Sequence, residues 1–314
     1  MSAQTVRVAA VDCGTNSLRL LVADVDPATG RTSELERTME VVRLGQGVDR
    51  TGTFAPEALQ RTFSAVENAA ELIARHRPGA VRFVATSASR DVSNREEFFA
   101  GIRERLGVSP DVVTGDEEAA LSFAGATAEL PAEQAPFLVV DLGGGSTELV
   151  LGGREVEAAR SLDMGSVRMT ERHLHDDPPS AAQVAAARAD VESVLAGSHV
   201  PLERTRTLVG VAGSITTITA AAIELAEYTP GCLHGVRLPV GQVREACERL
   251  LHVTRAERAA MPFVHPGRVD VIGAGALVWE TVLDRVVAQA GITEVVTSEH
   301  DILDGIAVAM ARTL

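Results

Sequence analysis

The sequence predicts an α/β protein made of two similarly built domains that flank a cleft. Patterns typical of strands alternate with patterns typical of helices along most of the chain. A hairpin pattern also occurs twice, because "VDCGTNSLRLLV" and "VDLGGGSTELVL" share the spacing V-D-x-G-x-x-S-x-x-L. The repeat places Asp12, Gly14 and Ser17 over Asp141, Gly143 and Ser146. Two halves that open with the same hairpin would bring the repeated residues face to face.

The first half is expected to start with strands at Val6–Val11, Leu18–Asp24 and about Met39–Leu44. The stretch "GQGVDRTG" predicts a loop that leads into a helix from about Pro56 to His76. "AVRFVATSASRD" predicts a strand that stops at small hydroxyl residues, and the next helix begins with the S-x-x-E capping pattern of Ser93 to Glu96. "DVVTGDEEAALSFAGATAEL" then predicts a strand, a glycine and an acidic helix start.

A polar linker bounded by prolines, Leu130 to Pro136, separates the halves, and we place the domain boundary between residues 132 and 133. The second half is predicted to start with a hairpin at Val139–Leu151 and a strand near Val156, followed by helices at about Ser166–His173 and Ala181–Leu195. "TLVGVAGSITTITAAAIEL" then predicts a strand that passes through a Gly-Ser turn into a helix. "GRVDVIGAGALVWETVLDRV" predicts a helix that is entered through glycines. "ITEVVTSEHDILDGIAVAMARTL" adds a strand and a terminal helix, for which Ser298 to Asp301 fit the capping pattern.

Composition restricts the classes of function. The 314 residues carry a formal charge of −14, which disfavours nucleic acid and anionic membranes as partners. All 29 basic residues are arginine, so a P-loop lysine and a Schiff-base lysine are both excluded. Cys13, Cys232 and Cys247 form no metal or disulfide pattern. With neither a bilayer-spanning run nor a secretory signal, we expect a cytoplasmic protein.

The repeated turns suggest phosphate binding. Glycines in a hairpin turn let backbone N–H groups approach an anion, although a glycine-rich turn alone is usually only a turn. Asp12 and Asp141, however, each end an apolar strand where a core residue is expected. A buried carboxylate needs a partner, and a divalent cation bridging to phosphate is a natural one. Glu148 could supply another metal oxygen or hold a water.

Three further stretches carry polar groups at helix starts. In "TGDEEAALSF", Asp116, Glu117 and Glu118 could simply stabilise the helix dipole, or one glutamate could act as a general base. In "ATSASRDVSN", the hydroxyls and Arg90 could hold phosphate or only cap a helix. In "GVAGSITTIT", Gly213 and Ser214 could place a helix N-terminus against an anion or serve close packing. We assign no histidine, in "HLHDDPP" or at His300, to a metal.

These motifs together resemble the exopolyphosphatase and guanosine-pentaphosphate phosphohydrolase family. "VDCGTNSLRLLVADVD", "FVATSASRDVSN", "VVTGDEEAALSF", "VVDLGGGSTELVLG", "SLDMGSVRMTER" and "VGVAGSITTIT" occur in the family's order. The resemblance implies two ribonuclease-H-like domains of the actin-like superfamily and the short, two-domain form of the family. It also implies that a terminal helix, about 300–314, packs on the first domain, 1–132, while 133–299 form the second.

The resemblance further implies a Mg²⁺ or Mn²⁺ requirement, a homodimer, and release of orthophosphate from polyphosphate or guanosine pentaphosphate. Glu118 would activate water, or Glu117 if the motif is shifted by one residue. Asp141 and Glu148 would be catalytic and bind the metal. The phosphate-binding set implied by the motifs is Asp12, Gly14, Thr15, Asn16, Ser17, Arg90, Gly143, Gly144, Gly145, Ser146, Thr147, Gly213 and Ser214. The motif "GDEEA" continues with Ala120, where several relatives have arginine.

Two other functions are weighed against hydrolysis. A kinase of the same superfamily would transfer phosphate from a nucleotide to a sugar, but the cysteine-histidine motif of repressor-type sugar kinases is absent. A non-catalytic sensor would bind polyphosphate or an alarmone without turnover. The presence of Glu118, Asp141 and Glu148 together favours an enzyme.

Overall fold

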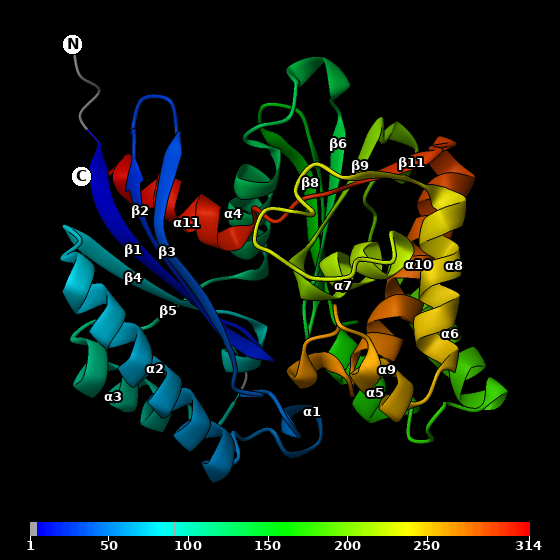
Figure 1. Cartoon of the computed structure of the whole chain (residues 1–314), viewed down its shortest axis with the longest axis horizontal. Helices are drawn as coiled ribbons and strands as arrows, with labels where there is room; N and C mark the ends of the chain where they lie inside the picture. Colours follow the sequence, from blue (N-terminus) through cyan, green and yellow to red (C-terminus); the bar gives the residue numbers. More distant parts are fainter. Residues whose placement is uncertain (1–4, 91) are drawn as a thin grey trace. The chain divides into compact units, whose positions relative to one another are not determined.

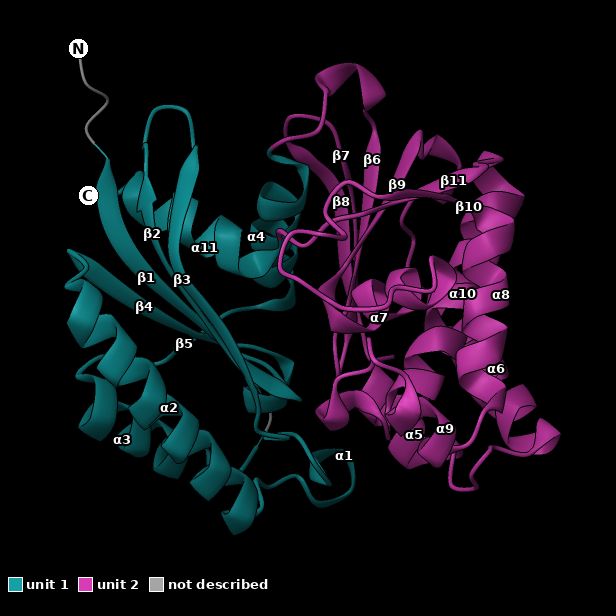
Figure 2. Cartoon of the chain, in the orientation of Figure 1, with its two compact units in different colours: residues 1–128, 301–314 teal, residues 129–300 magenta. Residues whose placement is uncertain are grey.

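The computed structural model describes residues 5–90 and 92–314. The chain forms two compact units (Figure 2): residues 1–128 with 301–314 make unit 1, and residues 129–300 make unit 2. Unit 2 is therefore a continuous insertion into unit 1, and the chain passes between them after Ala128 and again after His300. Across the described residues, no helix is both long enough and apolar enough to span a bilayer.

Unit 1 is built on a five-stranded sheet with the order β3-β2-β1-β4-β5 (Figure 1). Neighbours among β1, β2 and β3 are antiparallel, whereas β4 is parallel to β1 and β5 is parallel to β4. The strands are β1 Val6–Cys13, β2 Ser17–Val25, β3 Thr32–Val41, β4 Ala80–Ala85 and β5 Asp111–Val112. The helices are α1 Val48–Thr51, α2 Pro56–His76, α3 Arg95–Leu106, α4 Gly115–Thr127 and α11 Ile302–Ala311, with a short 3-10 turn at Ser87–Ser89.

The sheet of unit 1 has a packed core on each face, because side chains alternate along a strand. Ala9 and Val11 of β1 belong to the core that includes residues of α2 and α3. Val8 and Ala10 belong to the opposite core, which Ile302 and Ile306 of α11 complete. Helix α11 also packs against α4. The segment that follows unit 2 in the chain thus covers a face of the first sheet.

Unit 2 contains a six-stranded sheet with the order β10-β11-β9-β6-β7-β8. The strands are β6 Phe137–Leu142, β7 Thr147–Gly152, β8 Val156–Leu162, β9 Thr207–Val211, β10 Arg237–Pro239 and β11 Glu294–Thr297. The helices are α5 Ser166–His173, α6 Ala181–Ala196, α7 Ala212–Ala222, α8 Val240–His252, α9 Arg255–Ala260 and α10 Ile272–Ala290, with 3-10 turns at Ala132–Gln134, Leu202–Arg204 and Pro266–Arg268. Trp279 of α10 lies fully buried in its core.

The two sheets share one topology. Without the edge strand β10, the second sheet reads β8-β7-β6-β9-β11, which repeats the order and directions of β3-β2-β1-β4-β5. This arrangement of three antiparallel and two parallel strands is the ribonuclease-H-like fold expected for each half. The hairpin repeat in the sequence therefore corresponds to a repeated sheet.

The third strand of unit 1 was predicted wrongly. It covers Thr32–Val41 rather than Met39–Leu44. Its residues are exposed or half-buried, since it is an edge strand, and an edge strand needs no continuous apolar run. Pairing with Ser17–Val25 of β2 sets its extent instead. The prediction of a plain loop at "GQGVDRTG" was also wrong, because this stretch contains the single helical turn α1.

Two helix caps differ from the prediction. Helix α3 begins after Asn94, not Ser93, because the Ser93 backbone N–H donates to the carbonyl of Gly52 at 3.0 Å. Helix α11 is capped by Asp301, whose carboxylate accepts from the Leu303 N–H at 3.1 Å. Ser298, which was expected to cap this helix, lies before it and donates to the carbonyl of His300 at 2.8 Å. Gly213 and Ser214 lie within the first turn of α7 rather than in a turn before it.

Candidate functional site

The end of the first hairpin holds a buried ion pair. Asp12 on β1 lies directly opposite Arg19 on β2. The Nε and Nη2 atoms of Arg19 donate to Asp12 Oδ2 at 3.0 and 2.7 Å, and Nη1 donates to Asp301. Asp12 Oδ1 is buried and has no hydrogen-bond partner among the described residues. Burial raises the pKa of the Asp12 carboxyl more than the charge of Arg19 lowers it.

The turn that follows Asp12 directs backbone N–H groups away from the segment Val42 to Gly45, to which its carbonyls are bonded. The carbonyl of Thr15 accepts from the Gly45 N–H at 2.8 Å, and that of Asn16 accepts from Val42 and Arg43 at 3.0 and 2.9 Å. Because the peptide unit is planar and trans, the N–H groups of Asn16 and Ser17 point to the opposite side. The hydroxyls of Thr15 and Ser87 lie 3.1 Å apart beside this turn. The expected phosphate-binding residues Gly14, Thr15, Asn16 and Ser17 thus form one polar loop.

Glu117 and Glu118 have different roles in the structure. The Glu117 carboxylate accepts from the Thr114 N–H at 2.9 Å and closes a capping box at the start of α4. Glu118 is buried and forms an ion pair with Arg90, whose Nε also donates to the carbonyl of Val113 at 3.2 Å. The capping interpretation of the acidic cluster is therefore correct for Glu117. Glu118 takes no part in the capping box and pairs with Arg90 instead.

The second hairpin carries two acidic residues where the first has an ion pair. Asp141 on β6 lies directly opposite Glu148 on β7, and the two side chains are 7% and 1% exposed. Directly opposite residues have Cβ atoms about 5 Å apart. Ser161, opposite Glu148 on β8, donates its hydroxyl to Glu148 at 2.6 Å. Two carboxylates this close and this buried repel each other unless a proton or a cation lies near them, so the donor set fits a hard divalent cation.

The glycine turn between these strands is fixed from behind by helix α5. The carbonyl of Gly143 accepts from the Ser166 N–H at 3.0 Å, that of Gly144 accepts from Val167 at 2.8 Å, and that of Gly145 accepts from Arg168 Nε at 2.7 Å. The N–H groups of Gly144, Gly145 and Ser146 therefore point away from α5. Such an array of backbone donors binds anionic oxygens. The hydroxyl of Thr147 is not directed to the same side, because it is buried and donates to the carbonyl of Met164 at 2.7 Å.

Helix α5 can approach the turn only because residue 165 is glycine. A Cβ atom on Gly165 would lie 2.2 Å from the carbonyl oxygen of Gly144. Any side chain at this position would push α5 away from the turn. Gly165 belongs to "SLDMGSVRMTER", a motif of the resemblance to which the sequence analysis assigned no role.

Gly213 and Ser214 lie next to the carboxylates of unit 2. Asp141 is the register partner of Val211, the last residue of β9, and α7 begins at Ala212. Ala212 has a φ of 71°, a conformation that is strained for alanine and typical of functional sites. The side chain of Arg268 packs across Gly213. The start of α7 thus joins Asp141 at one end of the sheet.

Each unit gathers its candidate residues at the carboxyl ends of its parallel strands. In unit 1, β1 leads to the turn at Gly14 and β4 leads to Thr86. Strand β5 leads to the segment before Glu118. In unit 2, β6 and β9 lead to the glycine turn and to α7. Ligands of open α/β sheets bind at this end of the strands. All predicted site residues therefore lie in one of two groups, one in each unit.

The sequence analysis missed Arg19, Ser161, Arg168 and Gly165. A signal for Arg19 was present: it follows Asp12 by seven residues, as Glu148 follows Asp141. The repeat therefore predicts that Arg19 and Glu148 occupy equivalent positions. Asp12, for which a cation was considered, has an arginine as its partner.

Two sheets of this topology, each with a polar turn at the strand ends, define a protein of the actin-like fold class. Within that class, the model of the Ppx/GppA phosphatase family matches residues 21–309. This chain belongs to the Ppx/GppA family, as the motifs predicted.

Individual relatives support this assignment. The chain is 52% identical to Exopolyphosphatase 2 of Mycobacterium tuberculosis, over 97% of this chain and 98% of that protein. The crystal structure of an exopolyphosphatase-like protein superposes with a TM-score of 0.95 at 46% identity, covering 98% of both chains. A guanosine-5'-triphosphate,3'-diphosphate pyrophosphatase of Vibrio cholerae is 37% identical over 54% of this chain and 33% of its own length.

Proposed function

We propose that the protein is an exopolyphosphatase, which releases terminal orthophosphate from linear polyphosphate by metal-assisted attack of water. The relatives' names give the substrate class, and they also make guanosine pentaphosphate a substrate to test. The observation that carries the proposal is the buried pair of carboxylates, Asp141 and Glu148, beside a glycine turn with outward N–H groups.

Asp141 and Glu148 are the residues that would hold Mg²⁺ or Mn²⁺. Hard cations of this kind prefer carboxylate oxygens and water, which fits the donors present. When bound, the ion supplies charge neutralisation for the phosphate oxygens. The hydroxyl of Ser161 fixes one oxygen of Glu148 and so sets the orientation of that carboxylate.

The other residues would bind the phosphate chain and activate water. The N–H groups of Gly144, Gly145 and Ser146, together with those of the turn after Asp12, donate to phosphate oxygens. Glu118 accepts a proton from water as it attacks the terminal phosphorus, and the ion pair with Arg90 holds the Glu118 carboxylate in place. No step requires a lysine, and none is present.

The test is phosphate release from short polyphosphate, long polyphosphate and guanosine pentaphosphate, with Mg²⁺, with Mn²⁺ and without either. Glu118→Gln is expected to lower the turnover rate by about 10²–10⁴-fold. Glu117→Gln is the matched control: it weakens the α4 cap by about 1 kcal/mol but should leave turnover nearly unchanged.

Three results would contradict this proposal. Binding of all three substrates without turnover would favour a sensor, and phosphate transfer from a nucleotide to a sugar would favour a kinase. Loss of turnover in Glu117→Gln but not in Glu118→Gln would reassign the base.

We further propose a cytoplasmic homodimer, for which sedimentation of the purified protein tests the oligomeric state.

A further inference from the structure

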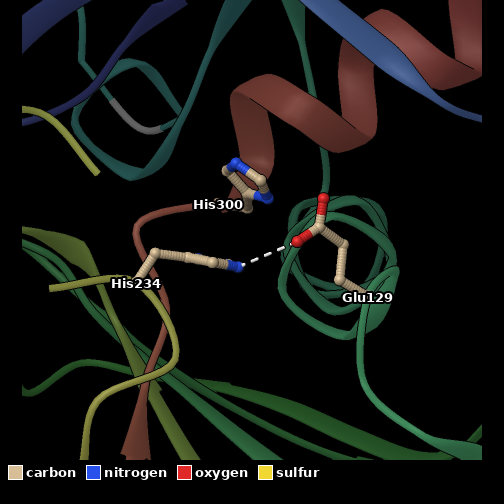
Figure 3. A group of neighbouring side chains, drawn as sticks. All are labelled: Glu129, His234 and His300. Atoms are coloured by element: carbon tan, nitrogen blue, oxygen red, sulfur yellow. Dashed lines mark hydrogen bonds and ion pairs between the residues drawn. The ribbon is translucent and has the colours of Figure 1, made fainter. Parts of the chain in front are cut away.

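Two histidines and a glutamate lie together in unit 2 (Figure 3). The ligand atoms of Glu129, His234 and His300 all lie within 4.8 Å of one another. Nε2 of His234 is 3.2 Å from Glu129 Oε2, and the two imidazole rings lie 4.2 Å apart between centroids. The reaction proposed above uses none of these side chains.

Separate segments bring the three residues together. Glu129 and His300 are the first and last residues of unit 2, so they mark the two places where the chain passes between the units. His234 belongs to the segment between α7 and β10. The neighbouring backbone is held by sheet contacts, because the Gly235 N–H donates to Thr297 at 2.8 Å and the Ser298 N–H donates to Gly210 at 2.9 Å. The cluster therefore rests on a fixed frame at its histidine side.

We propose that Glu129, His234 and His300 form a binding site for a first-row transition-metal dication, with Zn²⁺ as the favoured ion. Two imidazoles and one carboxylate are a ligand set that Zn²⁺ accepts with further positions left for water. Mg²⁺ prefers oxygen ligands and does not suit this site. The site is thus chemically distinct from the pair of Asp141 and Glu148.

Contacts at Nδ1, on the side of the ring opposite Glu129, orient the His234 imidazole. Nδ1 of His234 lies 3.5 Å from Ser298 Oγ and accepts from the Glu299 N–H at 3.3 Å. In the metal-free state, Nε2 therefore carries the proton and donates it to Glu129. Zn²⁺ at Nε2 requires the single ring proton to move from Nε2 to Nδ1, with no net release, where it would donate to Ser298 Oγ in place of the contact with the Glu299 N–H.

The exposure of the site indicates an exchangeable ion. The Glu129 side chain is 65% exposed, whereas that of His234 is 25% exposed. Closed structural zinc sites have four protein ligands, and this cluster offers three. An ion bound here would link Glu129 and His300, the first and last residues of unit 2. It is therefore expected to stabilise unit 2 near its two ends.

The test is titration of the chelator-treated full chain with Zn²⁺ alone, followed by calorimetry and by the visible absorption of Co²⁺ in its place. The background variant Glu148→Gln removes the other carboxylate pair as a zinc site. We expect one ion per chain in this background, retained in excess Mg²⁺. His234→Ala and His300→Ala should each weaken binding by about 100-fold, and Glu129→Gln should weaken it without disturbing the fold.

His252→Ala is the matched control, because His252 pairs with Glu248 at 3.1 Å on one helix and belongs to no three-ligand cluster of the described residues. Its zinc affinity should equal that of the background. The proposal is overturned if the background variant binds no stoichiometric Zn²⁺, or if the three ligand variants bind it as tightly as the background does. Since these readouts need no turnover, they remain decisive even if the polyphosphatase proposal fails.

Discussion

Glu148 lies directly across the β6–β7 ladder from Asp141, in the position that Arg19 takes opposite Asp12 in the first hairpin. The same backbone geometry therefore holds an ion pair in unit 1 and two like charges in unit 2. A pair of carboxylates suits a divalent cation better than an arginine–carboxylate pair does, which is why we propose Asp141 and Glu148 as the metal ligands.

Replacing one of the two like charges should have opposite effects on the stability of the fold and on the binding of the metal. Glu148→Gln is expected to raise the free energy of unfolding in chelator by about 1 kcal/mol, because opposed like charges destabilise a strand pair. The same change should raise the Mg²⁺ concentration needed for half-maximal phosphate release. Ser161→Ala, which removes only the hydrogen bond to Glu148, should leave the chelator-treated stability equal or lower. A loss of stability in Glu148→Gln would contradict the like-charge interpretation.

Removal of Arg19 should be costly, because it leaves the buried carboxylates of Asp12 and Asp301 without their common partner. We expect Arg19→Met to lower the free energy of unfolding by about 3–5 kcal/mol in urea titrations. Arg7→Met is the control in the same hairpin, since Arg7 pairs with Asp24 across β1 and β2 at a more exposed position. It should cost much less than Arg19→Met does, because exposed ion pairs contribute little to stability. Equal costs for the two variants would refute the assignment.

The raised pKa of Asp12 predicts a specific dependence on pH. A carboxyl whose folded pKa is above its unfolded value contributes stability that is fully present below the unfolded pKa, near about 3.9, and lost as pH rises through the folded pKa. The free energy of unfolding of the native chain, minus that of Asp12→Asn, should therefore fall as pH rises from 4 toward neutrality. Urea titrations at several pH values measure this difference. A difference that grows with pH would show that Arg19 dominates over burial.

A methyl group at position 165 should damage the phosphate-binding turn. Gly165→Ala would place a Cβ atom against the carbonyl of Gly144, so we expect a loss of about 1–3 kcal/mol in stability and a higher KM for polyphosphate. Gly241→Ala in α8 is the control, because nothing lies within 4 Å of its added Cβ atom. That variant should match the native chain or exceed its stability slightly. Wild-type KM in Gly165→Ala would mean that the turn tolerates displacement of α5.

The sequence predicted the fold well where the signal was a repeated pattern. The duplicated hairpin led to two related sheets, and the boundaries of α2 and α5 agree with the predicted helices. Where one element depends on another, local patterns were misleading. The extent of β3 follows from pairing with β2, and Ser93 lost its predicted capping role because its backbone bonds to Gly52 instead.

Parts of the site were similarly out of reach of local patterns. The choice between Glu117 and Glu118 depends on which carboxylate turns back to Thr114, which the helix start alone leaves open. His234 and His300 are 66 positions apart in sequence and meet only through the sheet that places β10 beside β11. No spacing rule joins them to Glu129.

The insertion of unit 2 within unit 1 has a consequence for synthesis on the ribosome. All strands of the second sheet lie between Glu129 and His300, so every strand of that sheet is synthesised before α11. The first sheet, although synthesised earlier, has one apolar face uncovered until Ile302 and Ile306 emerge. Domains that fold during translation usually do so in chain order. Here the unit that begins first is the one that finishes last, and its exposed face is the surface a chaperone would meet in the interval.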